Sequence, residues 1–287
     1  MAQFRYSDKN PLHPISVVEF DAMHTRVELL LTGLAEEQGR KFAEEVHLRM
    51  KDMELRFNRF DVKSPLAVVN SCASKEVVAV DEELFMALEL CEVFRVATKG
   101  YFSVATSTIK STTKPYGLDT ATHGVRFCLE GVQLDMGGFA KGFALEQVVN
   151  MVRESGAESA LLNFGNSSIA AIGHHPYGEW WQVGVENLMQ RGCPAYEVKL
   201  CDSAMSVSGR TLSGEYHIVN PHTGAKVAQD EMIVVEGRSP LVAEVLSTAL
   251  YAAPRSERGA ILDQFEGYMA TEVYCGQGGA ECRKIEQ

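Results

Sequence analysis

An acid, two adjacent glycines and a lysine follow one another within residues 134–144, where a short apolar strand would pass into a helix. Asp135 ends the apolar run, Gly137 and Gly138 form the turn, and Lys141 falls in the first helical turn. Glycine has no Cβ, so a ligand can approach the backbone there, and free N–H groups at a helix start favour phosphate. The segment therefore predicts a phosphate site. The alternative is a turn whose glycines serve only packing, because short glycine motifs often match by chance.

A second group of oxygen-bearing side chains lies within residues 243–250. Glu244 and Thr248 are four residues apart, so they share one face of a helix, and Ser247 lies close to that face. A carboxylate beside hydroxyls suits a hard cation such as Mg²⁺. The alternative is an ordinary helix, in which Glu244 lies on the solvent-exposed side and the Thr248 hydroxyl donates to a carbonyl of its own helix.

The third candidate is His217, at the start of a short apolar run over residues 216–219. Residues 220–224 are Asn-Pro-His-Thr-Gly, and Asn, Pro and Gly are residue types that favour a turn. A histidine with a pKa near neutrality can accept a proton from a hydroxyl, so His217 is a candidate general base. The alternative is a partly buried histidine with a structural role.

Composition restricts the partners of the chain. A net charge of −11 over 287 residues argues against nucleic acid or an anionic membrane surface as the main partner, but it does not exclude one phosphate-bearing ligand in a local pocket. No apolar run approaches the ~20 residues that cross a bilayer, and residues 1–9 are polar, without the features of a signal peptide. We therefore expect a cytoplasmic protein, although export of a trimmed precursor stays open. Seven cysteines without a Cys-x-x-Cys spacing exclude a zinc ribbon and favour a reducing compartment.

Periodicity gives the elements that must position these side chains. Helical spacing predicts helices over residues 35–57, 82–99, 139–155 and 256–265, and a further helix that begins at Ser239-Pro240. Strands are predicted over 17–20, 26–31, 76–80, 160–164, 181–186, 196–200, 216–219, 232–236 and 268–274. Ser64-Pro65 interrupts the helical pattern, and residues 101–123 read as a Ser/Thr-rich loop region.

Strand runs separated by isolated helices predict an α+β fold with mixed or antiparallel sheets and several packed helices, not a doubly wound nucleotide-binding fold. We expect one domain over residues 1–287, with loosely ordered tails at 1–14 and 276–287.

The order of the motifs carries more information than any one of them. An Asp-x-Gly-Gly-x-Ala-Lys-Gly run is followed by segments 161–166, 181–186, 206–209, 217–224 and 243–250. In this order the chain resembles the FAD:protein FMN transferase family, the ApbE-type flavin transferases, from Met23 to about Val273. The most specific parts of the resemblance are residues 135–144 and 244–250.

The resemblance implies an ApbE-like fold and an enzyme that binds FAD and Mg²⁺. Such an enzyme transfers the FMN half of FAD to a Thr or Ser hydroxyl of an acceptor protein and releases AMP. By position, the residues that would contact FAD are Met23, Phe60, Tyr101, Phe102, Ser103, Asp135, Gly137, Lys141, Ser208, His217 and Ile218. Those that would surround Mg²⁺ are Gly138 through its carbonyl, Glu244, Ser247 and Thr248.

Several positions depart from the family pattern. His24 stands where glycine is usual, Ser103 and Val104 replace an Asp-Pro pair, and Glu244 replaces an aspartate. The extra methylene of Glu244 moves its carboxylate by more than a metal–oxygen bond tolerates, unless the helix shifts. Two alternatives therefore stay open: an FAD-binding protein without transferase activity, and an FAD pyrophosphatase that gives FMN and AMP.

Overall fold

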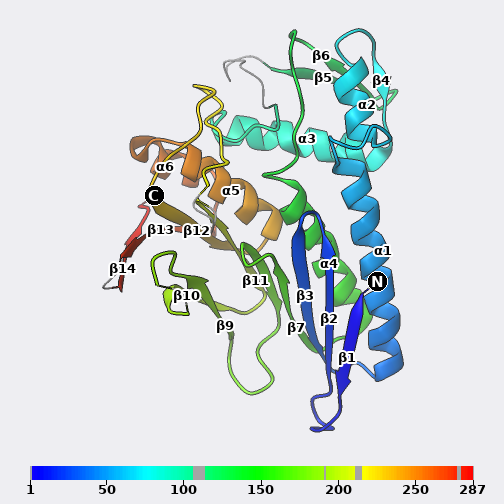
Figure 1. Cartoon of the computed structure of the whole chain (residues 1–287), viewed down its shortest axis with the longest axis vertical. Coiled ribbons are helices and arrows are strands. Elements are labelled where there is room, and N and C mark those ends of the chain that lie inside the picture. The colour runs from blue at the N-terminus through cyan, green and yellow to red at the C-terminus, as the bar shows by residue number, and fades with distance from the viewer. Residues whose placement is uncertain (1, 106–113, 191, 211–214, 277–278, 287) are drawn as a thin grey trace.

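The computed structural model describes residues 2–105, 114–190, 192–210, 215–276 and 279–286. It has an α+β fold in which helices cover one face of a large antiparallel sheet (Figure 1). The sheet has nine strands in the order β1-β2-β3-β7-β8-β11-β12-β13-β14. The first and last strands of the described chain therefore form its two opposite edges. The predicted fold class is therefore confirmed.

The strands of this sheet pair with their neighbours in antiparallel register throughout. Their bounds are β1 Gln3–Ser7, β2 Ile15–Ala22, β3 Thr25–Thr32, β7 Ser159–Phe164, β8 Ser168–Ile172, β11 Ser203–Ser208, β12 Glu231–Gly237, β13 Met269–Gly276 and β14 Gly279–Lys284.

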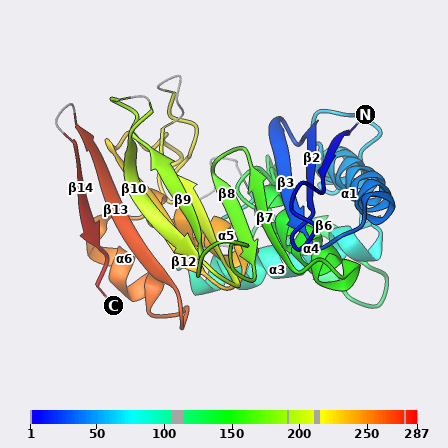
Figure 2. The same ribbon diagram turned by 90° about the horizontal axis from the view of Figure 1, so that it is seen from below.

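Seen from below, the sheet is strongly twisted and the helices lie along one side of it (Figure 2). Helices α4 and α5 pack against each other and against the middle strands β8 and β11, which places both helices under the centre of the sheet. The helix bounds are α1 Glu36–Phe57, α2 Pro65–Cys72, α3 Glu82–Ala97, α4 Ala140–Ser155, α5 Pro240–Ala252 and α6 Arg255–Leu262. Within the described ranges, none of the helices has the length and apolar character needed to cross a membrane.

Two smaller sheets complete the fold: β9 Trp181–Glu186 with β10 Pro194–Leu200, and β4 Val78–Ala79 with β5 Tyr116–Asp119 and β6 Gly124–Phe127. The β9–β10 pair packs against the face of the large sheet that the helices leave free. Strand β12 is consequently buried on both faces: Met232 and Val234 contact the β9–β10 side, whereas Ile233 and Val235 contact α5 and α6.

The structure corrects several local predictions. Strands β1 and β14 were not predicted, and they pair with β2 and β13 through backbone hydrogen bonds. Pro65 begins the helix α2, where its missing N–H is harmless, and β5 lies inside the predicted 101–123 loop region. Residues 216–219 do not form a strand and retain only an isolated bridge between Val219 and Lys226.

Candidate functional site

Most of the predicted site residues line one cavity of about 1110 Å³. It lies where the start of α4, one face of α5, the ends of β8, β9 and β11, and the segment 217–224 come together. The lining includes these predicted residues: Phe102, Ser103, Asp135, Gly137, Gly138, Lys141, Ser208, His217, Ile218, Glu244 and Thr248. The structure thus brings together the glycine turn, the oxygen-rich face of α5 and His217. Gly137 and Glu244 meet at this cavity although more than 100 residues separate them in the sequence.

The glycine turn and α5 are in direct contact. A Cβ atom built on Gly138 would lie 3.3 Å from Thr248 Cγ2, and one on Gly142 would lie 2.6 Å from Glu244 Cβ and 3.0 Å from the Pro240 carbonyl oxygen. Since 2.6 Å is closer than carbon atoms pack, only glycine allows α4 and α5 to cross this closely. The close crossing carries Lys141 to the neighbouring face of α5.

Lys141 and Glu244 form an ion pair at the floor of the cavity. Lys141 Nζ donates to Glu244 Oε1 at 2.5 Å, and it contacts Ser167 Oγ at 3.2 Å and Ser168 Oγ at 3.3 Å. The other carboxylate oxygen, Oε2, accepts from Ser206 Oγ at 2.8 Å and from Ser168 Oγ. Glu244 is 4% exposed, so these three partners of its carboxylate stabilise the charge that burial would otherwise penalise.

A chain of buried hydroxyl groups continues from this pair towards the cavity wall. Ser247 Oγ donates to the Glu244 carbonyl oxygen at 3.0 Å, and it lies 3.0 Å from Ser206 Oγ and 2.9 Å from Ser208 Oγ. Ser208 Oγ in turn lies 3.4 Å from Thr248 Oγ1. The hydroxyl of Ser247 is therefore saturated by its neighbours and lies beneath the cavity surface.

Asp135 lies at another part of the wall and is paired with a cation. Its Oδ2 lies 3.3 Å from Arg59 Nε, and its Oδ1 accepts the Gly137 N–H at 2.9 Å. The Arg59 guanidinium also stacks on the Phe60 ring, 4.6 Å from its centroid. Asn70 holds the preceding residue in place through two hydrogen bonds to the backbone of Leu134, which forms an isolated bridge with Ala105 where a short strand was predicted.

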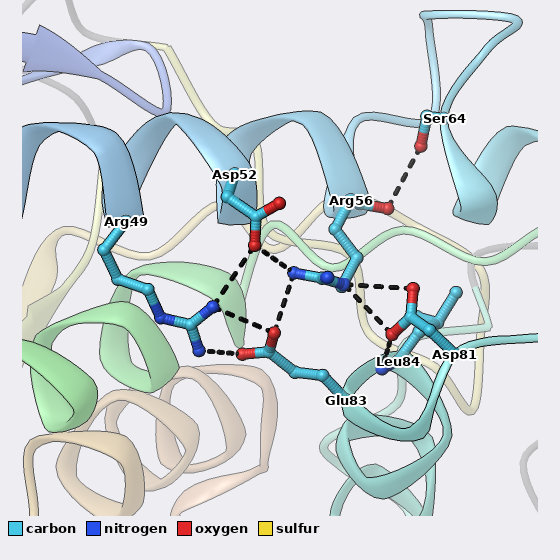
Figure 3. A network of polar contacts seen from close by, with 7 residues as sticks. All are labelled: Arg49, Asp52, Arg56, Ser64, Asp81, Glu83 and Leu84. Atoms are coloured by element: carbon cyan, nitrogen blue, oxygen red, sulfur yellow. Dashed lines mark hydrogen bonds and ion pairs between the residues drawn. The ribbon is translucent and has the colours of Figure 1, made fainter.

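The loop that carries Arg59 follows α1 and is fixed by a polar network between α1 and α3 (Figure 3). Arg56 pairs with Asp52, Asp81 and Glu83 at 2.6 to 3.0 Å, and its carbonyl oxygen accepts the Ser64 hydroxyl at 3.0 Å. Asp81 also accepts the Leu84 N–H and so caps α3. This network sets both ends of the loop over residues 58–64.

His217 lines the cavity with its ring open to solvent. Its turn is anchored from both sides, because Asn220 Nδ2 donates to the Ala252 carbonyl at the end of α5 and the Val227 N–H donates to the Ile218 carbonyl. Desolvation by the cavity wall, followed by the positive charges of Lys141 and Lys226, lowers the pKa of His217 from its ordinary value. The ring therefore stays neutral, and able to accept a proton, at lower pH than a free histidine.

Four predicted site residues do not line the cavity. Met23 packs against the core, and its N–H donates to Glu54. Phe60 is 76% exposed outside the cavity under Arg59, and Tyr101 packs on His222 with ring centroids 4.3 Å apart. Ser247 lies beneath the floor, as described above.

Sequence reasoning missed several residues of the site, among them Arg59, Ser167, Ser168, Glu186, Ser206 and Arg210. One signal was available for the buried hydroxyls. Ser206 and Ser208 are two residues apart in one strand, so both point to one face. No comparable spacing marks Arg59 or Arg210, which enter the site from loops.

The expected magnesium ligands fit the ion only in part. Gly138 and Thr248 are adjacent, but the carboxylate of Glu244 is bonded to Lys141 and two serines, and the hydroxyl of Ser247 is saturated. Among the described residues, no group of three or more histidine, cysteine, aspartate or glutamate side chains is placed to hold a metal ion. Mg²⁺ prefers six oxygen ligands, usually with at least one carboxylate. The arrangement therefore does not present the expected ligand set, and magnesium stays a prediction.

The fold and the cavity define a class of α+β proteins with one large ligand site built on a glycine turn and a helix face. The chain belongs to the ApbE family, whose model matches residues 23–271. An FAD:protein FMN transferase of Treponema pallidum is 26% identical to it, over 88% of this chain and 84% of that protein. Among solved structures, an ApbE protein of Thermotoga maritima matches with a TM-score of 0.80 and 20% identity, over 99% of this chain and 97% of the other. The flavin transferase ApbE of Vibrio cholerae matches with a TM-score of 0.79 and 15% identity, over the same shares of the two chains.

Proposed function

We propose that this protein transfers the FMN half of FAD to a Thr or Ser hydroxyl of an acceptor protein and releases AMP. The observation that carries the proposal is the convergence of the glycine turn, the α5 face and His217 on one cavity. Its volume of about 1110 Å³ slightly exceeds the ~300–1,000 Å³ range of small-molecule sites, so the cavity has room for a ligand as large as FAD. Family membership and relatives named FAD:protein FMN transferase support the same activity.

In this reaction an acceptor hydroxyl attacks the FMN phosphorus, the bond to the bridging oxygen breaks, and that oxygen leaves with AMP. The exposed ring of His217 is the base that takes the hydroxyl proton, because it is neutral near pH 7 and open to an approaching protein. The glycine backbone at 137 and 138 allows close approach of the phosphates, and the Lys141 ammonium supplies positive charge beside them.

Purified protein incubated with FAD and a flavin-acceptor protein tests the proposal. In-gel flavin fluorescence and mass spectrometry should show a covalent FMN adduct, with one AMP released for each adduct. His217→Ala should lower the rate by about 10²–10⁴. His174→Ala is the matched control, because this histidine is exposed in the β8–β9 loop and lies outside the cavity lining.

Two other outcomes would replace the proposal. Free FMN and AMP in the absence of an acceptor would assign the protein as an FAD pyrophosphatase. Tight FAD binding without AMP or adduct, under varied metal ions, would assign it as an FAD-binding protein.

A further inference from the structure

The charges at the cavity floor are arranged so that the cation faces the ligand space. The Lys141 side chain is 25% exposed and lines the cavity, whereas the Glu244 side chain behind it is 5% exposed. A phosphate in the cavity would therefore approach the ammonium before the carboxylate. Since Coulomb attraction falls with distance, the pair presents its positive end to the ligand.

Both carboxylate oxygens of Glu244 already accept hydrogen bonds from side chains of the protein. Its Oε1 accepts from Lys141, and its Oε2 accepts from both Ser206 and Ser168. The glutamate side chain is long enough to reach these partners across the gap between α5 and the strands β8 and β11. An aspartate at 244 would end one methylene earlier and could not keep the same three contacts.

Asp135, a second carboxylate that lines the cavity, is also paired. Asp135 pairs with Arg59 and accepts the Gly137 N–H. Of the expected ligand set, only the Gly138 carbonyl and the Thr248 hydroxyl remain, and both are neutral. Two neutral oxygens are a weak site for Mg²⁺, which binds proteins mainly through carboxylates.

We propose that the Lys141 ammonium, held in place by Glu244, is the cation that neutralises the phosphates of bound FAD in this chain, so that FAD binding does not require a divalent metal. The inference rests on the proposed function for the identity of the ligand. In this interpretation Glu244 is a positioning residue for Lys141, and Ser168 and Ser206 fix Glu244 in turn.

Equilibrium binding of FAD, followed by quenching of flavin fluorescence, tests this without turnover. The protein is freed of metal with EDTA, and the titration is then repeated with excess MgCl₂. The Kd of the wild type should change by less than about twofold, well below the tenfold that corresponds to 1.4 kcal/mol. Lys141→Met should weaken FAD binding by about tenfold or more in both buffers.

Glu244→Asp distinguishes two roles of Glu244, namely positioning Lys141 and supplying a negative charge. The variant keeps the carboxylate but shortens the side chain by one methylene. The shorter carboxylate should release Lys141 and come free for a metal, so FAD binding should weaken in EDTA and recover when Mg²⁺ is added. The exposed pair Lys41–Glu45 on α1, at 3.7 Å, provides the matched controls Lys41→Met and Glu45→Asp, which should bind as the wild type does.

If Lys141→Met does not fold, because it leaves a buried acid unpaired, the double variant Lys141→Met with Glu244→Gln removes both charges and keeps the measurement possible. Tenfold tighter FAD binding by the wild type on addition of Mg²⁺ would overturn the proposal. So would a Glu244→Asp variant that binds FAD as the wild type does in both buffers. Absence of FAD binding by wild type and controls alike would instead show that the proposed function itself is wrong, and the inference would fall with it.

Discussion

Two polar networks in this protein use the same chemistry in different surroundings. The network between α1 and α3 joins two arginines to three acids, and its side chains are 16–50% exposed (Figure 3). The network at the cavity floor has one lysine, one glutamate and a set of serines, and its acid is 5% exposed. Water can replace a lost partner in the first network but not in the second. The first should therefore tolerate changes, whereas the second should depend on each member.

The largest expected effect is that of Lys141→Met on stability. This change leaves the Glu244 carboxylate buried without its cation, so the free energy of unfolding should fall by about 3 kcal/mol. Urea unfolding followed by circular dichroism measures the loss. Adding Glu244→Gln should restore part of it, because the unpaired charge is then removed as well. Equal losses for the single and the double variant would contradict the interpretation.

Asp81→Ala should have a smaller effect in the exposed network. Asp81 caps α3 through the Leu84 N–H and pairs with Arg56, so its loss should cost about 1.5 kcal/mol, of which the cap contributes about 1 kcal/mol. The same unfolding measurement applies. Asp81→Asn keeps a capping oxygen and should lose only the smaller, charge-dependent part. If both variants lost the same amount, the cap would not be the main contribution.

Arg56→Met should lower the free energy of unfolding by about 1 kcal/mol, because its three acidic partners are partly solvated and Arg49 still pairs with Asp52 and Glu83. Raising the salt concentration should reduce this difference, since salt screens exposed charges. The same salt series should leave the effect of Lys141→Met nearly unchanged. A salt-sensitive Lys141→Met would remove the distinction between the two networks.

The smallest expected effect is on the titration of His217. The folded pKa lies below the ordinary value of 6.5, so the neutral ring persists on acidification and the acid limb of the rate profile should lie below pH 6.5. Below that pH the unfolded chain binds the proton more readily than the folded protein does. The free energy of unfolding should therefore fall as the pH drops below 6.5. Lys141→Met should raise the pKa of His217, although desolvation still holds it below 6.5. NMR titration of the ring protons measures the shift, and Arg56→Met should not move it.

The sequence predicts the elements of the site better than their side-chain partners. The helical spacing of Glu244 and Thr248 and the glycine turn before Lys141 place each group on the correct element, because both patterns depend on neighbours within a few residues. The pairing of Lys141 with Glu244 could not be predicted, because it joins positions 103 residues apart through the crossing of two helices.

The edge strands were missed for a different reason. β14 is mostly exposed, so its sequence lacks the apolar alternation that identifies a half-buried strand, and it is held by backbone pairing to β13. The opposite error occurred at residues 216–219, where, within the described part of the chain, the apolar run is paired only through the bridge from Val219 to Lys226. Apolar alternation reports burial, whereas strand formation requires a partner edge.

The contact between Gly142 and α5 offers a geometric way to perturb the site without altering any charge. A single methyl group at 142 would meet the Glu244 Cβ atom and the Pro240 carbonyl oxygen, and the two helices would have to separate to admit it. Separation would draw the ammonium of Lys141 away from its carboxylate while both keep their chemical identity. Gly142→Ala, which adds one methyl group, should therefore be enough to separate Lys141 from Glu244 at the floor of the cavity.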